Sequence, residues 1–148
     1  MREGANMRIT RLILFFISTM LLYVIAMLGL GFSYAYTKGW ILTDFESIEA
    51  KQAIVLLTND KNVTLLDVRT SKEYQEGHLK DAKHIPVQIL TQNLSMIKED
   101  KNKRILVYCR SGNRSIKASR ILEENGFTPI NIKGGYFQLI RDGIEAER

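Results

Sequence analysis

The fold of this chain is decided by the stretch RILVYCRSGNRS, residues 104–115. Its first half is a short apolar run flanked by charge, too brief for a helix, which predicts a buried strand that ends on Cys109. A small polar loop with one glycine follows, and then a segment with helical apolar spacing. At a strand-to-helix turn, loop N–H groups and the helix dipole favour a thiolate over a thiol. Cys109, the only cysteine in the chain, is therefore the candidate nucleophile.

Working outward from this stretch, apolar runs alternate with segments of helical spacing. This alternation predicts an α/β fold with a parallel central sheet and helices on both faces. Ligands of such sheets bind beyond the carboxyl ends of the strands, where Cys109 is expected. The predicted strands are 63–67, 82–85, 104–109 and 128–132. The predicted helices are 44–58, capped by Thr43 and Glu46, a short one in 69–77 with Ser71 as N-cap, 87–99, 114–125, and a terminal one after Gly134-Gly135.

The N-terminal part of the chain has the composition of a membrane span. No charged residue occurs from Leu12 to Leu30, and a helix of that length, at about 1.5 Å per residue, nearly matches a hydrocarbon core of roughly 30 Å. We expect a basic cytoplasmic leader at 1–11, a transmembrane helix at 12–32, a linker at 33–42 and the globular domain at 43–148.

Basic residues before the span predict that the domain lies on the extracytoplasmic, periplasmic side of the membrane. The triplet Ser33-Tyr34-Ala35 is similar to a signal-peptide cleavage site, so export followed by signal cleavage is the alternative. An uncleaved anchor is favoured because the apolar run exceeds the 7–15 residues usual for a signal peptide.

Charge and cysteine content exclude several functions. The net charge is +5, but residues 1–39 hold four basic residues and one acidic residue, which leaves +2 for the domain. No dense basic stripe with interleaved aromatics occurs there, so nucleic-acid binding is not expected. A single cysteine rules out an intrachain disulfide and a cysteine-based metal site. The two histidines, His78 and His84, bracket a turn and are read as structural, so we expect neither a metal nor a cofactor.

Several short motifs follow one another in an order and spacing that resemble a single rhodanese domain. The similarity covers roughly residues 43–143. The motifs are Leu65-Leu66-Asp67-Val68-Arg69, Glu73-Tyr74, Gly77-His78-Leu79, Ala82, Ile85-Pro86, the loop from Cys109 to Arg114, and Lys133-Gly134-Gly135.

The resemblance implies a rhodanese-like fold and a sulfurtransferase. In that chemistry a cysteine thiolate takes a sulfane sulfur from thiosulfate or a similar donor, holds it as a persulfide, and passes it to a thiol or cyanide. Cys109 matches the nucleophile. The expected partners are small sulfur-containing anions, a thiol or protein acceptor, and the membrane through residues 12–32. The residues of the expected active-site loop are Arg110, Ser111, Gly112, Asn113 and Arg114.

Individual roles follow from the chemistry of each side chain. Gly112 lets the loop backbone approach the sulfur closely. Arg110 and Arg114 are candidates to bind donor oxygens as forked donors. Arg114 is the better candidate, because a cation at a helix start is unfavourable unless an anion is present. Asp67 and Arg69 are expected to tie neighbouring loops together through charge-assisted hydrogen bonds rather than to take part in catalysis. Glu73 and His78 are also read as structural, and Tyr136 and Phe137 as core or pocket wall.

Two other functions use the same kind of loop. Phosphatases of this fold have five residues between cysteine and arginine and a histidine before the cysteine. Here four residues separate Cys109 from Arg114, and Tyr108 takes the histidine position, which disfavours a phosphate cradle. A membrane-tethered sulfur carrier or redox interaction module without turnover needs the same loop as the enzyme, so that alternative stays open.

Overall fold

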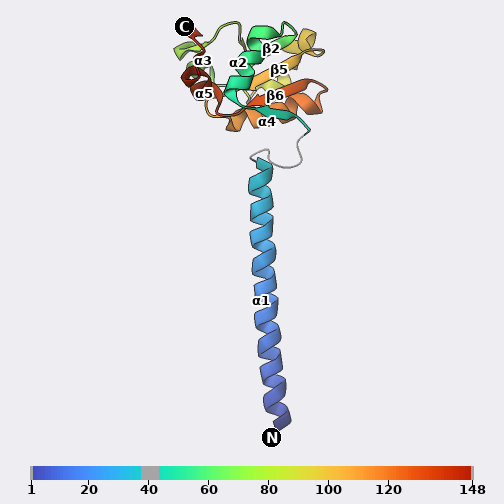
Figure 1. The fold of residues 1–148 in the computed structure, drawn as a ribbon. Helices are drawn as coiled ribbons and strands as arrows, with labels where there is room; N and C mark the ends of the chain where they lie inside the picture. Colours follow the sequence, from blue (N-terminus) through green and yellow to red (C-terminus); the bar gives the residue numbers. More distant parts are fainter. Residues whose placement is uncertain (1, 38–43, 148) are drawn as a thin grey trace. The chain divides into compact units, whose positions relative to one another are not determined.

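The computed structural model of the chain describes residues 2–37 and 44–147. The chain divides into two compact units, one within residues 1–41 and one from residue 42 onward (Figure 1). The first unit is a single helix and the second is an α/β domain.

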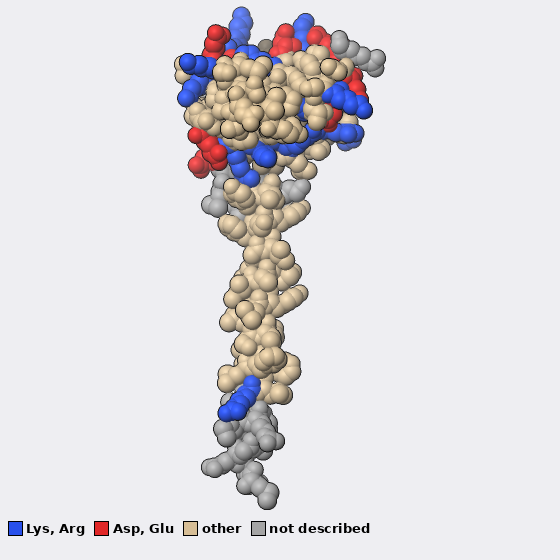
Figure 2. Space-filling view, turned by 180° about the vertical axis from the view of Figure 1, so that it is seen from behind, with Lys and Arg blue, Asp and Glu red and all other residues tan. Residues whose placement is uncertain are grey.

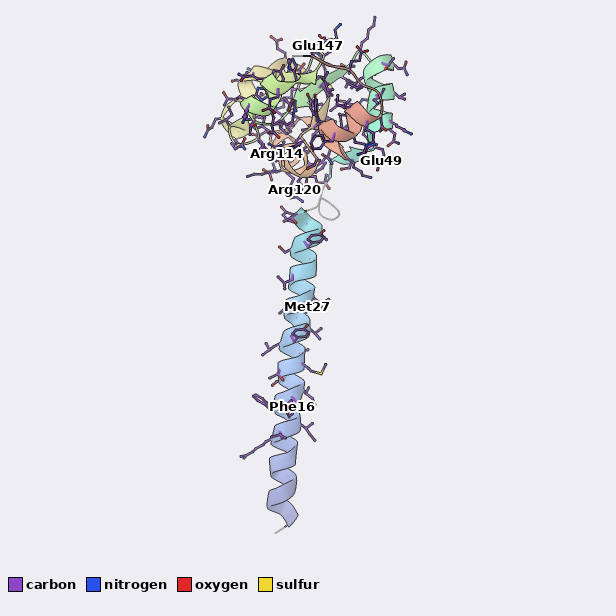
Figure 3. The ribbon with its side chains drawn as sticks, turned by 90° about the vertical axis from the view of Figure 1, so that its left-hand side faces the viewer. Phe16, Met27, Glu49, Arg114, Arg120 and Glu147 are labelled. Atoms are coloured by element: carbon purple, nitrogen blue, oxygen red, sulfur yellow. The ribbon has the colours of Figure 1, made fainter. Side chains whose placement is uncertain are left out.

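The helix α1 spans Arg2–Thr37, and its part Arg11–Thr37 is long and apolar enough to cross a membrane. Beyond Arg11 its surface carries no charged side chain (Figure 2). Apolar side chains such as Phe16 and Met27 are more than half exposed along it (Figure 3). The helix continues to Thr37, so the first residues of the predicted linker are helical; the other linker residues lie outside the described ranges.

The globular unit is built on a five-stranded sheet in the order β1-β6-β5-β2-β4. All neighbouring strands in it are parallel, as predicted. In the register, Asp67 at the end of β2 lies beside Tyr108 at the end of β5, so Cys109 follows directly at the carboxyl edge. The strands are β1 Glu46–Ile48, β2 Val63–Asp67, β4 Lys83–His84, β5 Arg104–Tyr108 and β6 Thr128–Ile132.

Helices cover both faces of this sheet (Figure 1). Successive strand residues point to opposite faces, so Val107 and Cys109 pack into one apolar cluster while Leu106 and Tyr108 pack into the other. The first cluster includes residues of α4 and two 3₁₀ helices, and the second includes residues of α2 and α5. These elements are α2 Ala50–Asn59, η1 Leu90–Gln92, η2 Leu94–Asp100, α4 Asn113–Glu124 and α5 Gly135–Arg141.

Three sequence predictions about elements are wrong. Residues 46–48, predicted as helix, form β1 beside β6, and three residues are too few to show a strand period. The helix begins at Ala50 instead, where the Glu49 N–H donates to Gln52 Oε1 at 2.9 Å. Thr43, the predicted cap, lies outside the described residues. Helix α3, Ser71–Glu76, is capped by Thr70 rather than Ser71 and ends at Gly77.

The third wrong prediction is the single α-helix over 87–99. This segment forms the two 3₁₀ helices η1 and η2, and Ile97 has non-helical backbone angles within η2. The three-residue spacing of Leu94 and Ile97 suits the 3₁₀ period, in which side chains eclipse at i and i+3. A further pair of two-residue strands, β3 His78–Leu79 and β7 Ala146–Glu147, forms an antiparallel ribbon that the sequence analysis does not include.

Candidate active site

Cys109 lies where the structure turns from β5 into α4. Its side chain is 1% exposed, and its sulfur accepts a hydrogen bond from the Gly112 N–H at 3.1 Å. Gly112 has φ +99°, and a Cβ there would lie 3.2 Å from the Gly134 backbone nitrogen. Glycine meets both demands, because it adopts the left-handed region at low cost and leaves room for the neighbouring backbone. The Ser115 hydroxyl donates to the Gly112 carbonyl at 3.0 Å and closes the turn.

The start of α5 holds the outer side of the same loop. The Tyr136 N–H donates to the Cys109 carbonyl at 2.7 Å, and the Phe137 N–H donates to the Arg110 carbonyl at 3.3 Å. Gly135, at φ +55°, makes this contact possible, because a Cβ there would lie 2.3 Å from the Cys109 carbonyl oxygen. Gly135 is therefore what allows α5 to dock on the cysteine loop.

This docking also fixes the direction of the loop's N–H groups. In a trans peptide the C=O and N–H point in opposite directions, and the described residues contain no cis peptide bond. Since the carbonyls of Cys109 and Arg110 point at α5, the N–H groups of Arg110 and Ser111 point away from it. Of the three loop N–H groups, that of Gly112 contacts the sulfur, and those of Arg110 and Ser111 face the side of the loop away from α5.

Arg114, at the other end of the loop, pairs with Glu73 of α3. Two terminal guanidinium nitrogens each donate to one carboxylate oxygen at 2.7 Å. Thr70 adds hydrogen bonds to the same carboxylate from its backbone N–H and its hydroxyl. The hydrogen bonds from Arg114 lower the pKa of Glu73, burial raises it, and the hydrogen bonds from Thr70 lower it further. The net result is a pKa of about 2. In turn, Glu73 raises the pKa of Arg114, and Cys109 raises it to a smaller extent. Arg114 is labelled on the globular unit in Figure 3.

Asp67 and Arg69 form a buried pair beside the loop. The Arg69 guanidinium donates to both Asp67 carboxylate oxygens at 2.7–3.0 Å and also to the Gly77 carbonyl at 2.7 Å. It lies 4.1 Å from the ring centre of Tyr136. The pair thus contacts the end of β2, the turn after α3 and the start of α5; the role of these contacts in tying the loops together stays a prediction.

Tyr108, just before the cysteine, belongs to the same network. It is fully buried and its hydroxyl accepts the Leu79 N–H at 3.3 Å. Burial, followed by the nearby charge of Asp67, raises the pKa of Tyr108. The position before the cysteine therefore holds a neutral phenol with a structural contact.

A small cavity of about 140 Å³ opens next to the loop. Among the loop residues, Arg110, Ser111 and Asn113 are exposed and Arg114 is partly buried. Arg110 contributes to the cavity wall and its guanidinium carbon lies 4.9 Å from the ring centre of Phe137. The lining residues are Arg69, Glu73, Glu76, Gly77, Arg110, Tyr136 and Phe137.

Sequence reasoning names most of these residues but misses how they pair. Nothing in the sequence links Glu73 to Arg114, which lie 41 positions apart, although the Thr70-x-x-Glu73 spacing is a capping-box signal that places Glu73 at a helix start. The structural reading of the histidines gains a specific form. The rings of His78 and His84 each stack on the Tyr74 ring, with ring centres 3.8 Å and 4.3 Å from that of Tyr74.

The fold and the site thus combine a parallel α/β sheet, a buried cysteine that follows a strand at its carboxyl edge, and a helix docked on the loop after that cysteine. Residues 49–142 match the Rhodanese-like domain family. The chain belongs to this family, and the fold and the motif resemblance are confirmed.

Individual relatives support the same assignment. A sulfurtransferase from Allochromatium vinosum is 31% identical over 98 residues, which cover 66% of this chain and 90% of that protein. A tRNA uridine(34) hydroxylase from Buchnera aphidicola is 36% identical over 100 residues, 64% of this chain and 32% of that protein. The chain thus spans about a third of that hydroxylase. A rhodanese-like domain protein from Staphylococcus aureus aligns with a TM-score of 0.62 at 32% identity, over 70% of this chain and all of the other.

Proposed function

We propose that this protein is a rhodanese-type sulfurtransferase that uses Cys109 to carry sulfur from thiosulfate or a similar donor to a thiol or cyanide. The rhodanese-like domain supports a sulfurtransferase-type function, and the similar protein named a sulfurtransferase is covered over 90% of its length. The observation that carries the proposal is the Gly112 N–H on the Cys109 sulfur at 3.1 Å, within a loop whose preceding N–H groups point away from α5.

The proposed reaction has two balanced steps. The Cys109 thiolate attacks the outer sulfur of thiosulfate; a new S–S bond forms, the sulfur–sulfur bond of the donor breaks, and sulfite leaves with the bonding electron pair. A thiolate or cyanide then attacks the outer sulfur of the persulfide, and Cys109 leaves as a thiolate. No net oxidation or proton transfer is needed. The loop N–H groups stabilise the anionic persulfide between the steps.

The loop length supports sulfur over phosphate. Four residues separate Cys109 from Arg114, and Arg114 is engaged by Glu73 through both terminal nitrogens. A phosphate cradle needs a wider ring of donors around three or more oxygens. Binding of donor oxygens by Arg110 and Arg114 remains a prediction, with Arg110 the more accessible of the two.

We also propose that α1 anchors the protein in a membrane with the domain on the extracytoplasmic side. The support is the uncharged apolar stretch within Arg11–Thr37 and the basic residues that precede it. Signal cleavage after export is the alternative, in which the domain is released.

Steady-state turnover of the full chain with thiosulfate, and with cyanide or a thiol as acceptor, tests the function. We expect wild type to turn over repeatedly and Cys109→Ser to fall to background, with Ile140→Ala, an exposed position on α5, as the control. A single stoichiometric loading of wild type without further turnover would favour the sulfur carrier. Full turnover by Cys109→Ser would contradict both.

A further inference from the structure

Three arginines lie around the cavity and the cysteine loop, and two of them are committed to carboxylates. Arg69 is 3% exposed and its guanidinium is bound by Asp67 and the Gly77 carbonyl. Arg114 is held by Glu73. Arg110 is exposed, lines the cavity, and forms no ion pair within the described part of the globular unit. Arg110 is therefore the cation of this group that is available to a ligand.

The contact that Arg110 does make is with Phe137. The guanidinium carbon lies 4.9 Å from the ring centre, within the range of a cation–π interaction. The two residues are also joined through the backbone, because the Phe137 N–H donates to the Arg110 carbonyl. The Phe137 side chain is 52% exposed, so burial in the core does not explain its aromatic character.

A guanidinium that lies on an aromatic face keeps its hydrogen-bond donors free. The ring attracts the flat face of the cation, while the N–H donors point outward in the guanidinium plane. Both residues line the same cavity. Of the two glutamates in that cavity, Glu73 is neutralised by Arg114, which leaves Glu76 as the acid that opposes an anionic ligand.

We propose that Phe137 is a positioning residue that holds the Arg110 guanidinium over the cavity to bind the anionic end of a donor that reacts with Cys109. The inference deepens the proposed function by assigning the selection of anionic over neutral reagents to the Arg110–Phe137 pair. The proposal concerns the attraction of an anionic reagent to the cavity beside Cys109. It does not depend on which sulfur donor the protein uses.

Alkylation of Cys109 in the full chain gives a test that is independent of sulfur transfer. In iodoacetate and iodoacetamide alike, the thiolate sulfur bonds to the methylene carbon, the carbon–iodine bond breaks, and iodide leaves with the electron pair. The reagents have similar size and differ in charge, so the ratio of their rates cancels differences in access to the buried sulfur. Because Cys109 is the only cysteine, the alkylated mass of the peptide that contains it reports this thiol.

We expect Arg110→Gln to lower the iodoacetate-to-iodoacetamide rate ratio most. Phe137→Leu, which keeps an apolar side chain but removes the ring, is expected to lower the ratio roughly two- to fivefold, the effect of an exposed cation–π contact. Phe137→Trp should retain the wild-type ratio, since indole is the best cation–π partner. Ile140→Ala, on the same helix and 37% exposed, serves as the control and should leave the ratio unchanged.

Other outcomes would overturn the proposal. An unchanged ratio in Phe137→Leu would show that the ring does not position Arg110. If Phe137→Leu slowed alkylation by iodoacetate and iodoacetamide equally, Phe137 would control access to the sulfur. If the rate ratio of Phe137→Leu were unchanged but sulfur transfer to a protein acceptor were weaker, Phe137 would be a docking residue. In thiosulfate turnover, Phe137→Leu should raise KM and spare kcat. If the alkylation ratios behave as expected while thiosulfate is not turned over, the inference stands and the proposed function fails.

Discussion

At the scale of single residues, a backbone N–H group and a charged side chain both act on the Cys109 sulfur. The Gly112 N–H contacts the sulfur, and Arg114 lies within electrostatic reach of it while it is paired with Glu73. Because a backbone N–H keeps its polarity at every pH, we expect the support that it gives to the proposed persulfide on Cys109 not to depend on pH. The role of Glu73 is then to hold Arg114 and the loop in place.

The Glu73–Arg114 pair makes stability depend on pH in a specific window. The pKa of Glu73 is about 2 in the folded protein, below its ordinary value of 4.5. A carboxyl group with a lowered folded-state pKa contributes stability that is fully present above its unfolded pKa and is lost as the pH falls toward its folded pKa. We therefore expect the Glu73 contribution to fade between about pH 4.5 and pH 2.

Thermal unfolding of wild type and Glu73→Gln from pH 7 to pH 3 measures this contribution. The melting temperatures of the two proteins should differ most at pH 7 and converge as the pH falls. Glu76→Gln is the matched control, because Glu76 lies on the same helix and forms no ion pair within the described residues. A constant difference between wild type and Glu73→Gln at every pH would contradict the assignment.

The Asp67–Arg69 pair predicts a larger loss of stability. Both side chains are at most 4% exposed, and removal of one charge from a buried pair costs about 3–5 kcal/mol. Asp67→Asn should therefore lower the free energy of unfolding by that amount in chemical denaturation. Lys133→Gln, which breaks an ion pair with Glu49 whose side chains are more than half exposed, should cost less than about 1 kcal/mol. Equal losses in the two variants would show that the buried network does not stabilise the fold.

The residues of the site could be predicted from the sequence in part. Cys109 and its loop follow from a strand, a glycine and a helix that are neighbours in the chain. The pairing of Arg114 with Glu73 and of Arg69 with the Gly77 carbonyl could not be predicted from local patterns, because each partner lies on a separate element that only the tertiary fold brings close.

At the scale of elements, the docking of α5 on the cysteine loop rests on Gly135. A Cβ there would lie 2.3 Å from the Cys109 carbonyl oxygen, closer than atoms tolerate, so Gly135→Ala must push α5 or the loop away. We expect loss of sulfur transfer together with reduced stability, measured by turnover and by chemical denaturation.

Gly143→Ala separates this clash from simple backbone strain. Gly143 also has a positive φ, +102°, but an added Cβ there meets no atom within 4 Å. Its substitution should cost only the strain of a left-handed backbone, about 1–3 kcal/mol, and should retain activity. If Gly143→Ala lost as much activity as Gly135→Ala, contact with the cysteine loop would not be the reason.

Most elements could be predicted from the sequence, and the strands that were missed share a cause. The strands 63–67 and 128–132 have the same bounds in the structure, since four of the five residues in each are branched or apolar and give a clear signal. β1, β3 and β7 have only two or three residues, too few for a period. They form because a partner strand is already in place, which is tertiary information. The 3₁₀ helices were predicted as one α-helix because both share apolar spacings of three or four residues.

At the scale of the whole molecule, the parallel sheet puts the cysteine and the start of the first strand at opposite edges of the globular unit. β1 begins at Glu46, and neighbouring strands of the main sheet are all parallel. The start of β1 therefore lies at the amino edge of the sheet, while Cys109 follows β5 at the carboxyl edge.

The proposed orientation across the membrane predicts protease sensitivity from outside. Protease added to spheroplasts that contain the full chain should digest the globular unit and leave cytoplasmic control proteins intact. An anchored protein should also stay with the membrane fraction after an alkaline wash, whereas a cleaved one should be released. Complete protection of the globular unit would contradict export of the domain.

The most direct measurement of the central claim is the mass of the full chain after incubation with thiosulfate and removal of the excess donor. Wild type should become one sulfur atom heavier, with the added mass located on the peptide that contains Cys109, and an added thiol or cyanide should return it to its starting mass. Cys109→Ser should gain nothing. An unmodified wild-type chain, or a sulfur adduct that no acceptor removes, would contradict the proposed sulfur transfer.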